Sequence, residues 1–138
     1  MIQYRYRGFS DNTGQWAYGD LIHNQKVTLT GLEPRSMVGG YEIDPATVGI
    51  SSGLKDSDGK EIFEGDILES AGGSRIAIVR DSEAPCLVGI SQIAWTYHKD
   101  NLRSEPRYLA RNAASMKIIG NIHQNPELMQ LDIKAGKR

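Results

Sequence analysis

The chain has 138 residues, of which 39% are hydrophobic and 24% are charged, with a formal net charge of −1. This composition is typical of a soluble globular protein, and the charge balance argues against a general attraction to nucleic acid or anionic membranes. The single cysteine excludes an intramolecular disulfide and a cysteine-based zinc site, and no segment is apolar for long enough to span a bilayer. We therefore predict a cytoplasmic protein with one domain over residues 1–138, in which 133–138 form a frayed tail.

The first third of the chain alternates between apolar and polar residues, as strands with one buried face do. Residues 2–23 are predicted to form a hairpin whose returning strand starts at Trp16. Residues 26–30 alternate again and predict another strand. Pro34 and a pair of glycines predict that 31–40 is a loop.

The middle and the end of the chain predict short strands joined by tight turns. Residues 41–43 form a short strand, and Asp44 followed by Pro45 is typical of a turn or of a single helical turn. Further strands are predicted at 61–69 (with a bend at Gly65), 75–80, 86–90 and 116–123. Three apolar residues of the last strand are expected to share one face, namely Met116, Ile118 and Ile122.

Asn125 and Pro126 have the pattern of a helix start, with an amide cap before a proline at the first helical position. This predicts a short C-terminal helix that reaches about residue 132. Seven or eight short strands with little helix, joined by short connections, predict a mainly β, antiparallel fold. A small barrel or roll with minor helical elements fits best.

The stretch 53–68 gathers five acidic residues and three glycines, which raises the question of a metal loop or a phosphate cradle. Aligned on a calcium-binding EF-hand loop through Gly59, it places Leu54 and Gly65 where the first and last ligands belong. As a phosphate-binding loop it is one residue too long, and Glu61 stands where the Mg²⁺-binding hydroxyl should be. Both interpretations are rejected.

Turns explain the same acidic stretch better. Asp58-Gly59 is the preferred pair for a type I′ hairpin turn, and Gly65-Asp66 allows a bend where the next strand begins. The acidic side chains are then mostly solvated flanks of turns, and the stretch predicts no bound ion.

Isolated residues that could bind a metal or act as a nucleophile provide little evidence for a functional site. The three histidines (His23, His98 and His123) have no partner at metal-ligand spacing, and Cys86 is interpreted as a buried apolar residue rather than a nucleophile. We predict no catalytic residue, no cofactor and no metal.

The segment 95–117 is the best candidate for a binding surface, because aromatic and basic side chains alternate along it. This pattern is typical of surfaces that stack bases and neutralise phosphates of single-stranded nucleic acid. Its candidate residues are Trp95, Lys99, Arg103, Arg107, Tyr108, Arg111 and Lys117. Pro106 argues against one continuous helix there, and Asp100 and Glu105 dilute the positive charge. An ordinary solvated face over core aromatics is the favoured alternative.

Three stretches together resemble the YopX family of phage and prophage proteins, namely 5–22, 43–68 and 117–128. They match the patterns W-x-Y-G-D-L-I, D-P-x-T-V-G with T-G-L-x-D-x-x-G-x-x-I-[YF]-E-G-D-I, and V-I-G-N-I-Y-x-N-P-E-L. The motif residues, expected to be structural, are Trp16, Gly19, Asp20, Asp44, Gly53, Asp58, Gly59, Gly65, Asp66, Gly120, Asn121, Asn125 and Pro126. Three positions depart conservatively from these patterns, namely Ser52, Ile118 and His123.

The resemblance implies an SH3-like barrel or roll, a phage or prophage origin and the cytoplasm of a bacterial host. It implies no reaction, so no catalytic residue is carried over. The favoured function is a non-catalytic accessory protein that binds an unknown protein partner or forms a homo-oligomer. Two alternatives stay open: binding of single-stranded nucleic acid through 95–117, and an enzyme, which a deep polar pocket of converging acids would favour.

Overall fold

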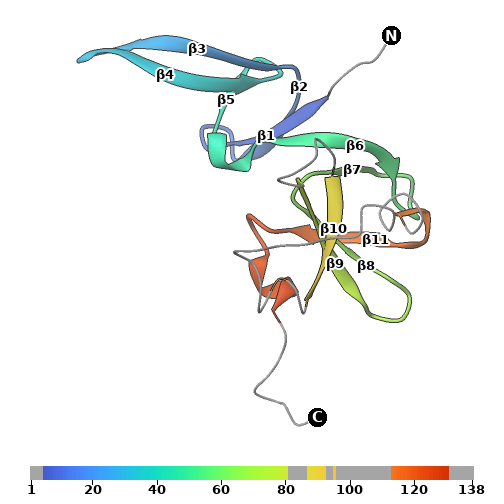
Figure 1. Ribbon diagram of the computed structural model, residues 1–138. Helices are drawn as coiled ribbons and strands as arrows, with labels where there is room; N and C mark the ends of the chain where they lie inside the picture. The colour runs from blue at the N-terminus through green and yellow to red at the C-terminus, as the bar shows by residue number, and fades with distance from the viewer. Residues whose placement is uncertain (1–4, 81–86, 93–94, 96–112, 131–138) are drawn as a thin grey trace. The chain divides into compact units, whose positions relative to one another are not determined.

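The computed structural model describes residues 5–80, 87–92, 95 and 113–130, and this part of the chain is mainly β with curled antiparallel sheets (Figure 1). Two compact units divide the chain, Met1–Ser51 and Ser52–Arg138. The closed SH3-like barrel stays a prediction.

The first unit contains five strands, one 3-10 helix and the start of a sixth strand: β1 (Tyr6–Ser10), β2 (Gln15–Gly19), β3 (Leu21–Thr28), β4 (Gly31–Val38), β5 (Tyr41–Ile43), η1 (Pro45–Thr47) and β6 (Gly49–Lys55). β1 pairs with β2 and with the start of β6, whereas β3, β4 and β5 form a sheet in that order. Ala17, Val38 and Ile43 are its buried apolar core.

The predicted first hairpin is confirmed between β1 and β2, where the Gly14 N–H donates to the Ser10 carbonyl at 2.8 Å. The predicted length of the returning strand was wrong. The backbone leaves the strand at Gly19, where φ is 143°. Trp16 and His23 therefore lie in different strands of different sheets.

The predicted loop at 31–40 was wrong, because most of it is strand β4. Gly39 and Gly40, with φ of 60° and 90°, form the two-residue turn that joins Val38 to Tyr41. Two successive positive φ values define a type I′ hairpin turn, which strongly favours glycine. The glycine pair therefore marks a tight turn between strands rather than a long loop.

The turn predicted at Asp44 is confirmed as the capped 3-10 helix η1. The Asp44 carboxylate accepts from the Ala46 N–H at 3.0 Å, as an N-cap side chain does. The Thr47 hydroxyl at the end of η1 accepts from the Phe9 N–H at 2.8 Å, and the backbone N–H of Asp44 donates to the Phe9 carbonyl at 2.9 Å. These bonds attach η1 to β1.

The second unit contains the rest of β6, then β7 (Glu61–Phe63), β8 (Asp66–Glu69), β9 (Arg75–Arg80), β10 (Leu87–Ser91), η2 (Ala113–Ser115), β11 (Lys117–Asn121) and η3 (Pro126–Met129). A four-stranded antiparallel sheet has the order β10-β9-β8-β11. Consecutive side chains point to opposite faces of a strand, and Ile67 and Leu68 belong to two separate apolar clusters. The sheet is therefore covered on both faces.

Strand β11 contains a bulge that changes the predicted face of its side chains. Its pairing with β8 shifts register between Ile118 and Gly120. Because an extra residue moves the following side chains to the other face, Ile118 packs on one cluster and Ile122 on the other. The prediction that these two residues share a face was wrong.

The predicted C-terminal helix is reduced to the single 3-10 turn η3. Gln130 already has extended backbone angles (φ −81°, ψ 138°), so the helix does not continue toward residue 132. Asn125 makes no side-chain cap bond to this helix. The tail predicted to be frayed, 133–138, lies outside the described residues.

Candidate interaction site

The acidic stretch folds as a hairpin turn stabilised by one buried carboxylate. Asp56, only 5% exposed, accepts from the N–H groups of Asp58 at 2.9 Å, Lys60 at 2.8 Å and Ile118 at 3.0 Å. Burial raises the pKa of the Asp56 carboxyl, but these three N–H donors outweigh it, with help from the Lys60 charge, so the pKa is lowered overall.

The predicted type I′ turn at Asp58-Gly59 was wrong. No described residue other than glycine has a positive φ, so Asp58 cannot occupy a central position of that turn. The Gly59 N–H donates to the Asp56 carbonyl at 3.0 Å, and Gly59 follows with φ of 81°. This arrangement is a three-residue hairpin loop that ends in a glycine bulge.

The prediction that the acidic side chains are solvated flanks was wrong for two of them. Asp66 is 2% exposed, and its carboxylate accepts from the Phe63 N–H at 2.8 Å. Gly65, which lies between β7 and β8, has φ of 99° and forms the predicted bend. Asp56 and Asp66 are therefore used to hold backbone, whereas Asp58 is solvated.

The C-terminal motif forms a compact polar network. Asn121 donates its N–H to the Asn125 side-chain oxygen at 3.2 Å and accepts from the N–H groups of His123 and Gln124 at 3.0 and 2.9 Å. A Cβ at Gly120 would lie 2.6 Å from the Asn125 oxygen, so only glycine fits without displacement. These contacts connect the end of β11 to the turn that follows it.

The N-terminal motif residues also contact other residues of their own unit. The Trp16 ring packs edge-on against Phe9 with 5.5 Å between centroids. Gly19 lies against the Gly39 backbone, and the Asp20 carbonyl accepts from the Gly39 N–H at 3.2 Å. In the second unit, Gly53 adopts φ of 77° within β6.

The predicted nucleic-acid surface is described at two positions. Trp95 is half-buried and packs against the cluster of Ile67, Ala77 and Met129. Lys117 is exposed, and its amino group lies 3.8 Å from the Asp58 carboxylate. The other predicted members lie outside the described residues: Lys99, Arg103, Arg107, Tyr108 and Arg111. This surface stays a prediction.

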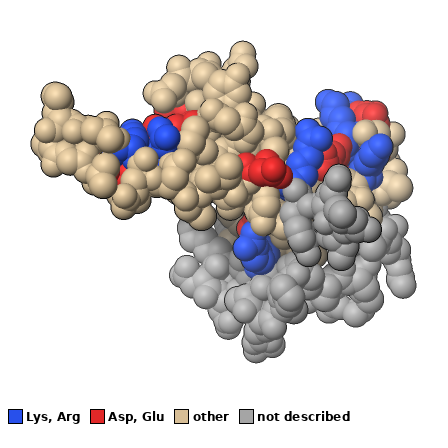
Figure 2. Space-filling view, turned by 90° about the horizontal axis from the view of Figure 1, so that it is seen from above, with Lys and Arg blue, Asp and Glu red and all other residues tan. Residues whose placement is uncertain are grey.

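A site that the sequence reasoning missed lies on the β3–β4 hairpin, which runs as a two-stranded ribbon past the end of β5 (Figure 1). Val27 is 83% exposed, Leu29 106% and Leu32 63%. Val27 and Leu32 are directly opposite each other, and we call these three residues the hairpin tip. The end of the hairpin is uncharged on the face shown in Figure 2. The uncharged run VTLTGL at 27–32 was the available sequence signal.

The backbone of this hairpin leaves one long edge open. Val38 and Tyr41 flank a two-residue turn, so their backbone N–H and C=O groups point toward each other. Because these groups alternate in direction along a strand, those of every second residue of β4, including Pro34, also point toward the β5 side. Pro34 has no N–H, and past the end of β5 this position faces no described strand. That is the sheet position where proline is tolerated.

The same alternation assigns the backbone groups of β3. The backbone N–H and C=O groups of its even-numbered residues point toward β4. Those of its odd-numbered residues point away from the sheet, namely Leu21, His23, Gln25 and Val27. Among the described strands, β3 is the edge of its sheet, and none of them pairs with these outward N–H and C=O groups.

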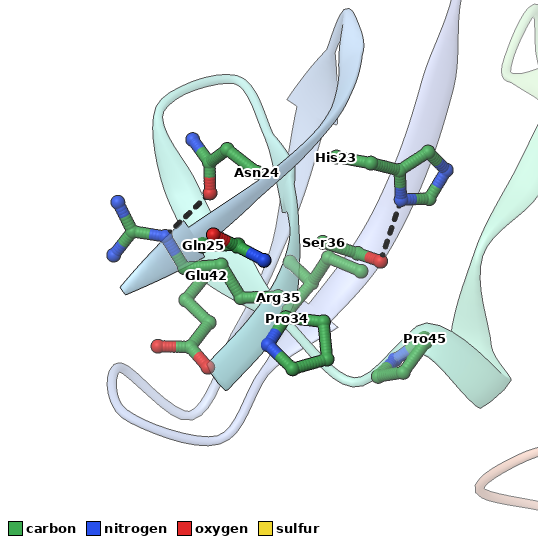
Figure 3. A pocket seen from close by; sticks show the side chains of 9 residues that line it. His23, Asn24, Gln25, Pro34, Arg35, Ser36, Glu42 and Pro45 are labelled. Atoms are coloured by element: carbon green, nitrogen blue, oxygen red, sulfur yellow. Dashed lines mark hydrogen bonds between the residues drawn. The ribbon is translucent and has the colours of Figure 1, made fainter. Parts of the chain in front are cut away.

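Beside β4 and the end of β5 is a pocket of about 470 Å³, shown in Figure 3. It is lined by His23, Asn24, Gln25, Pro34, Arg35, Ser36, Glu42, Ile43 and Pro45. The His23 Nδ1 and the Ser36 hydroxyl lie 3.0 Å apart, and the Arg35 Nε donates to the Asn24 side-chain oxygen at 2.7 Å.

The polar groups of the pocket are linked to one another across strands. Glu42 pairs with Lys26 at 2.9 Å, which leaves the His23–Ser36 pair without a carboxylate bonded to the imidazole in the described structure. No group of three His, Cys, Asp or Glu residues that could hold a metal ion occurs in the described part of the chain.

The profile of the YopX protein family matches residues 5–130. Among solved structures, the chain is similar to the crystal structure of protein EF1440 from Enterococcus faecalis, with a TM-score of 0.50 and 21% sequence identity. That similarity covers 94% of this chain and 100% of the other. No curated protein matches the chain. Within the described residues, no helix has the length and apolar character that crossing a membrane requires. Because the family profile covers almost the whole chain, the protein belongs to the YopX protein family.

Proposed function

We propose that this chain is a non-catalytic interaction module, an accessory protein of a phage or prophage in the bacterial cytoplasm, and that it binds proteins through the β3–β4 hairpin. The observation that carries the proposal is the exposed hairpin tip of Val27, Leu29 and Leu32 next to an open strand edge.

The physical argument is the cost of leaving this surface in water. Complete burial of a Val or Leu side chain contributes about 1.5–3 kcal/mol. Single exposed apolar residues are common on protein surfaces, but a cluster beside unpaired strand backbone is typical of a site for strand addition. A partner that covers the tip and pairs with the edge would gain binding free energy both from apolar burial and from backbone hydrogen bonds.

The buried acids support binding over catalysis. Asp56 and Asp66 direct their carboxylates to backbone N–H groups of their own turns and, for Asp56, also to the Ile118 N–H of β11, with distances of 2.8–3.0 Å. The hydrogen bonds of these carboxylates are made within the protein and stabilise its fold. The pocket carries paired side chains rather than several acids that share one cavity.

The test is a triple variant, Val27→Ser, Leu29→Ser and Leu32→Ser, compared with the wild-type chain as tagged bait in bacteria that carry the prophage. Co-isolated proteins and bait self-association are quantified by mass spectrometry and light scattering. Because the tip is exposed, the variant should remain folded and lose its partners. Tyr18→Ser, at another exposed apolar residue (44%), is the matched control and should retain them.

Two results would contradict the proposal. One is an identical set of partners for the wild-type chain and the triple variant. The other is a wild-type chain that retains no protein and does not self-associate.

A further inference from the structure

We infer that the partner of the hairpin edge is a second copy of this chain, with β3 of each copy paired antiparallel about a two-fold axis at Asn24. This inference rests on the proposed function and deepens it. It joins two three-stranded sheets into one continuous sheet with the order β5-β4-β3-β3-β4-β5.

Strand β3 lacks the features that normally keep an edge strand from pairing. Natural edges are short, bulged, or carry proline or a free lysine. β3 has eight residues, no proline and an uninterrupted register with β4. Its one charged residue, Lys26, is held by Glu42 at 2.9 Å. The other exposed edge of the hairpin, in β4, does carry a proline, Pro34.

The outward backbone groups select a single register. They belong to Leu21, His23, Gln25 and Val27, and an isologous pairing must match this set with itself. With the axis at Asn24, Leu21 pairs with Val27 of the second copy, and His23 with Gln25. Every outward group then has a partner, whereas a shift of the axis by one residue leaves a residue of each strand unmatched.

The side chains are self-complementary in this register, which is the reason to choose a second copy over an unrelated strand. The exposed Val27 lies opposite Leu21 of the other copy, which extends the apolar surface across the junction. Ile22, 53% exposed, lies opposite the aliphatic stem of Lys26. Asn24 lies opposite Asn24 of the second copy. No like charges are opposed.

The register is tested by a disulfide. Asn24 points its backbone toward β4, so the Asn24–Asn24 pair is non-hydrogen-bonded, with Cα atoms about 4.5 Å apart. This is within the range that a disulfide spans. With Cys86, the single cysteine, replaced by serine, Asn24→Cys should form a covalent dimer on mild oxidation. Thr30→Cys on the same background is the control, because the two copies of residue 30 would lie about 40 Å apart.

The hydrogen-bonded edge is tested by sedimentation of the whole chain over a range of concentrations. The wild-type chain should approach twice 15.3 kDa. Gln25→Pro removes an outward N–H and leaves the β3–β4 bonds in place, so it should raise the dimer Kd about tenfold or more. Gln25→Ala keeps the N–H and should sediment like the wild-type chain.

A monomeric wild-type chain at all concentrations, or an Asn24→Cys disulfide that forms no faster than that of Thr30→Cys, would overturn this inference. If the hairpin tip still determines capture of another protein, the proposed function survives that failure. If the triple variant changes nothing either, both fail.

Discussion

Replacement of Asp56 by asparagine gives the sharpest test of how the acidic stretch is used. Asparagine keeps one oxygen for the N–H groups of Asp58 and Lys60, but its amide nitrogen then faces the Ile118 N–H. Two donors would point at each other in a buried position. The variant should therefore lose the link between the hairpin turn and β11 while it keeps the turn itself.

The magnitude follows from the lost bond. A hydrogen bond to a charged group contributes about 1.5–3 kcal/mol, and Asp56 is 5% exposed, so solvent screens it little. We expect Asp56→Asn to lower the free energy of unfolding by about 2 kcal/mol at pH 7, and Asp56→Ala by about 3–4 kcal/mol. Urea denaturation with an unchanged slope would measure both. Asp58→Asn is the matched control, with a change within about 0.5 kcal/mol expected for its exposed 3.8 Å pair.

The pH dependence gives an independent check. The folded state lowers the pKa of Asp56 below its ordinary value of 3.8, so the unfolded chain takes up the proton first. The stabilisation is fully present above that ordinary value and is lost as the pH falls through the lower, folded-state pKa. The gap between wild type and Asp56→Asn should narrow over the same range. An equal stability at pH 7, or a gap that does not change with pH, would refute the reasoning.

Two further substitutions test the other motifs by the same denaturation assay. Gly120→Ala places a Cβ 2.6 Å from the Asn125 oxygen and 2.9 Å from Leu128, and should cost about 1–3 kcal/mol. A neutral result would show that this turn is not close-packed. Asp44→Ala removes the cap of η1 and should cost about 1 kcal/mol, whereas Asp44→Asn should recover most of it. Equal losses for both variants would argue against a capping role.

Local chemistry explains which elements could be predicted from the sequence. The Asp44-Pro45 cap, the short strand at 41–43 and the β9 strand at 75–80 depend on residues close to one another in the chain, and all three are confirmed. The family could also be recognised, because its motifs are contiguous. Composition misled where one signal has two structural outcomes. Pro34 and the glycine pair indicate a loop or an edge strand with a tight turn, and only the pairing of strands distinguishes them.

The candidate site depended on contacts between distant residues. The buried Asp56 accepts its third N–H bond from Ile118, far along the chain, and no local pattern distinguishes it from the exposed Asp58. The open edge of β3 is likewise a property of the sheet order.

The sequence by itself determined the mainly β class, the family, and turns such as the Asp44-Pro45 cap and the bend at Gly65, because turn geometry and alternation act over a few residues. The tertiary structure alone decided three features: which acids are buried, which face follows the bulge in β11, and which strand edge is left open. Burial and strand pairing depend on what the rest of the chain brings alongside. The hairpin that carries the proposed function was therefore visible only in the folded protein.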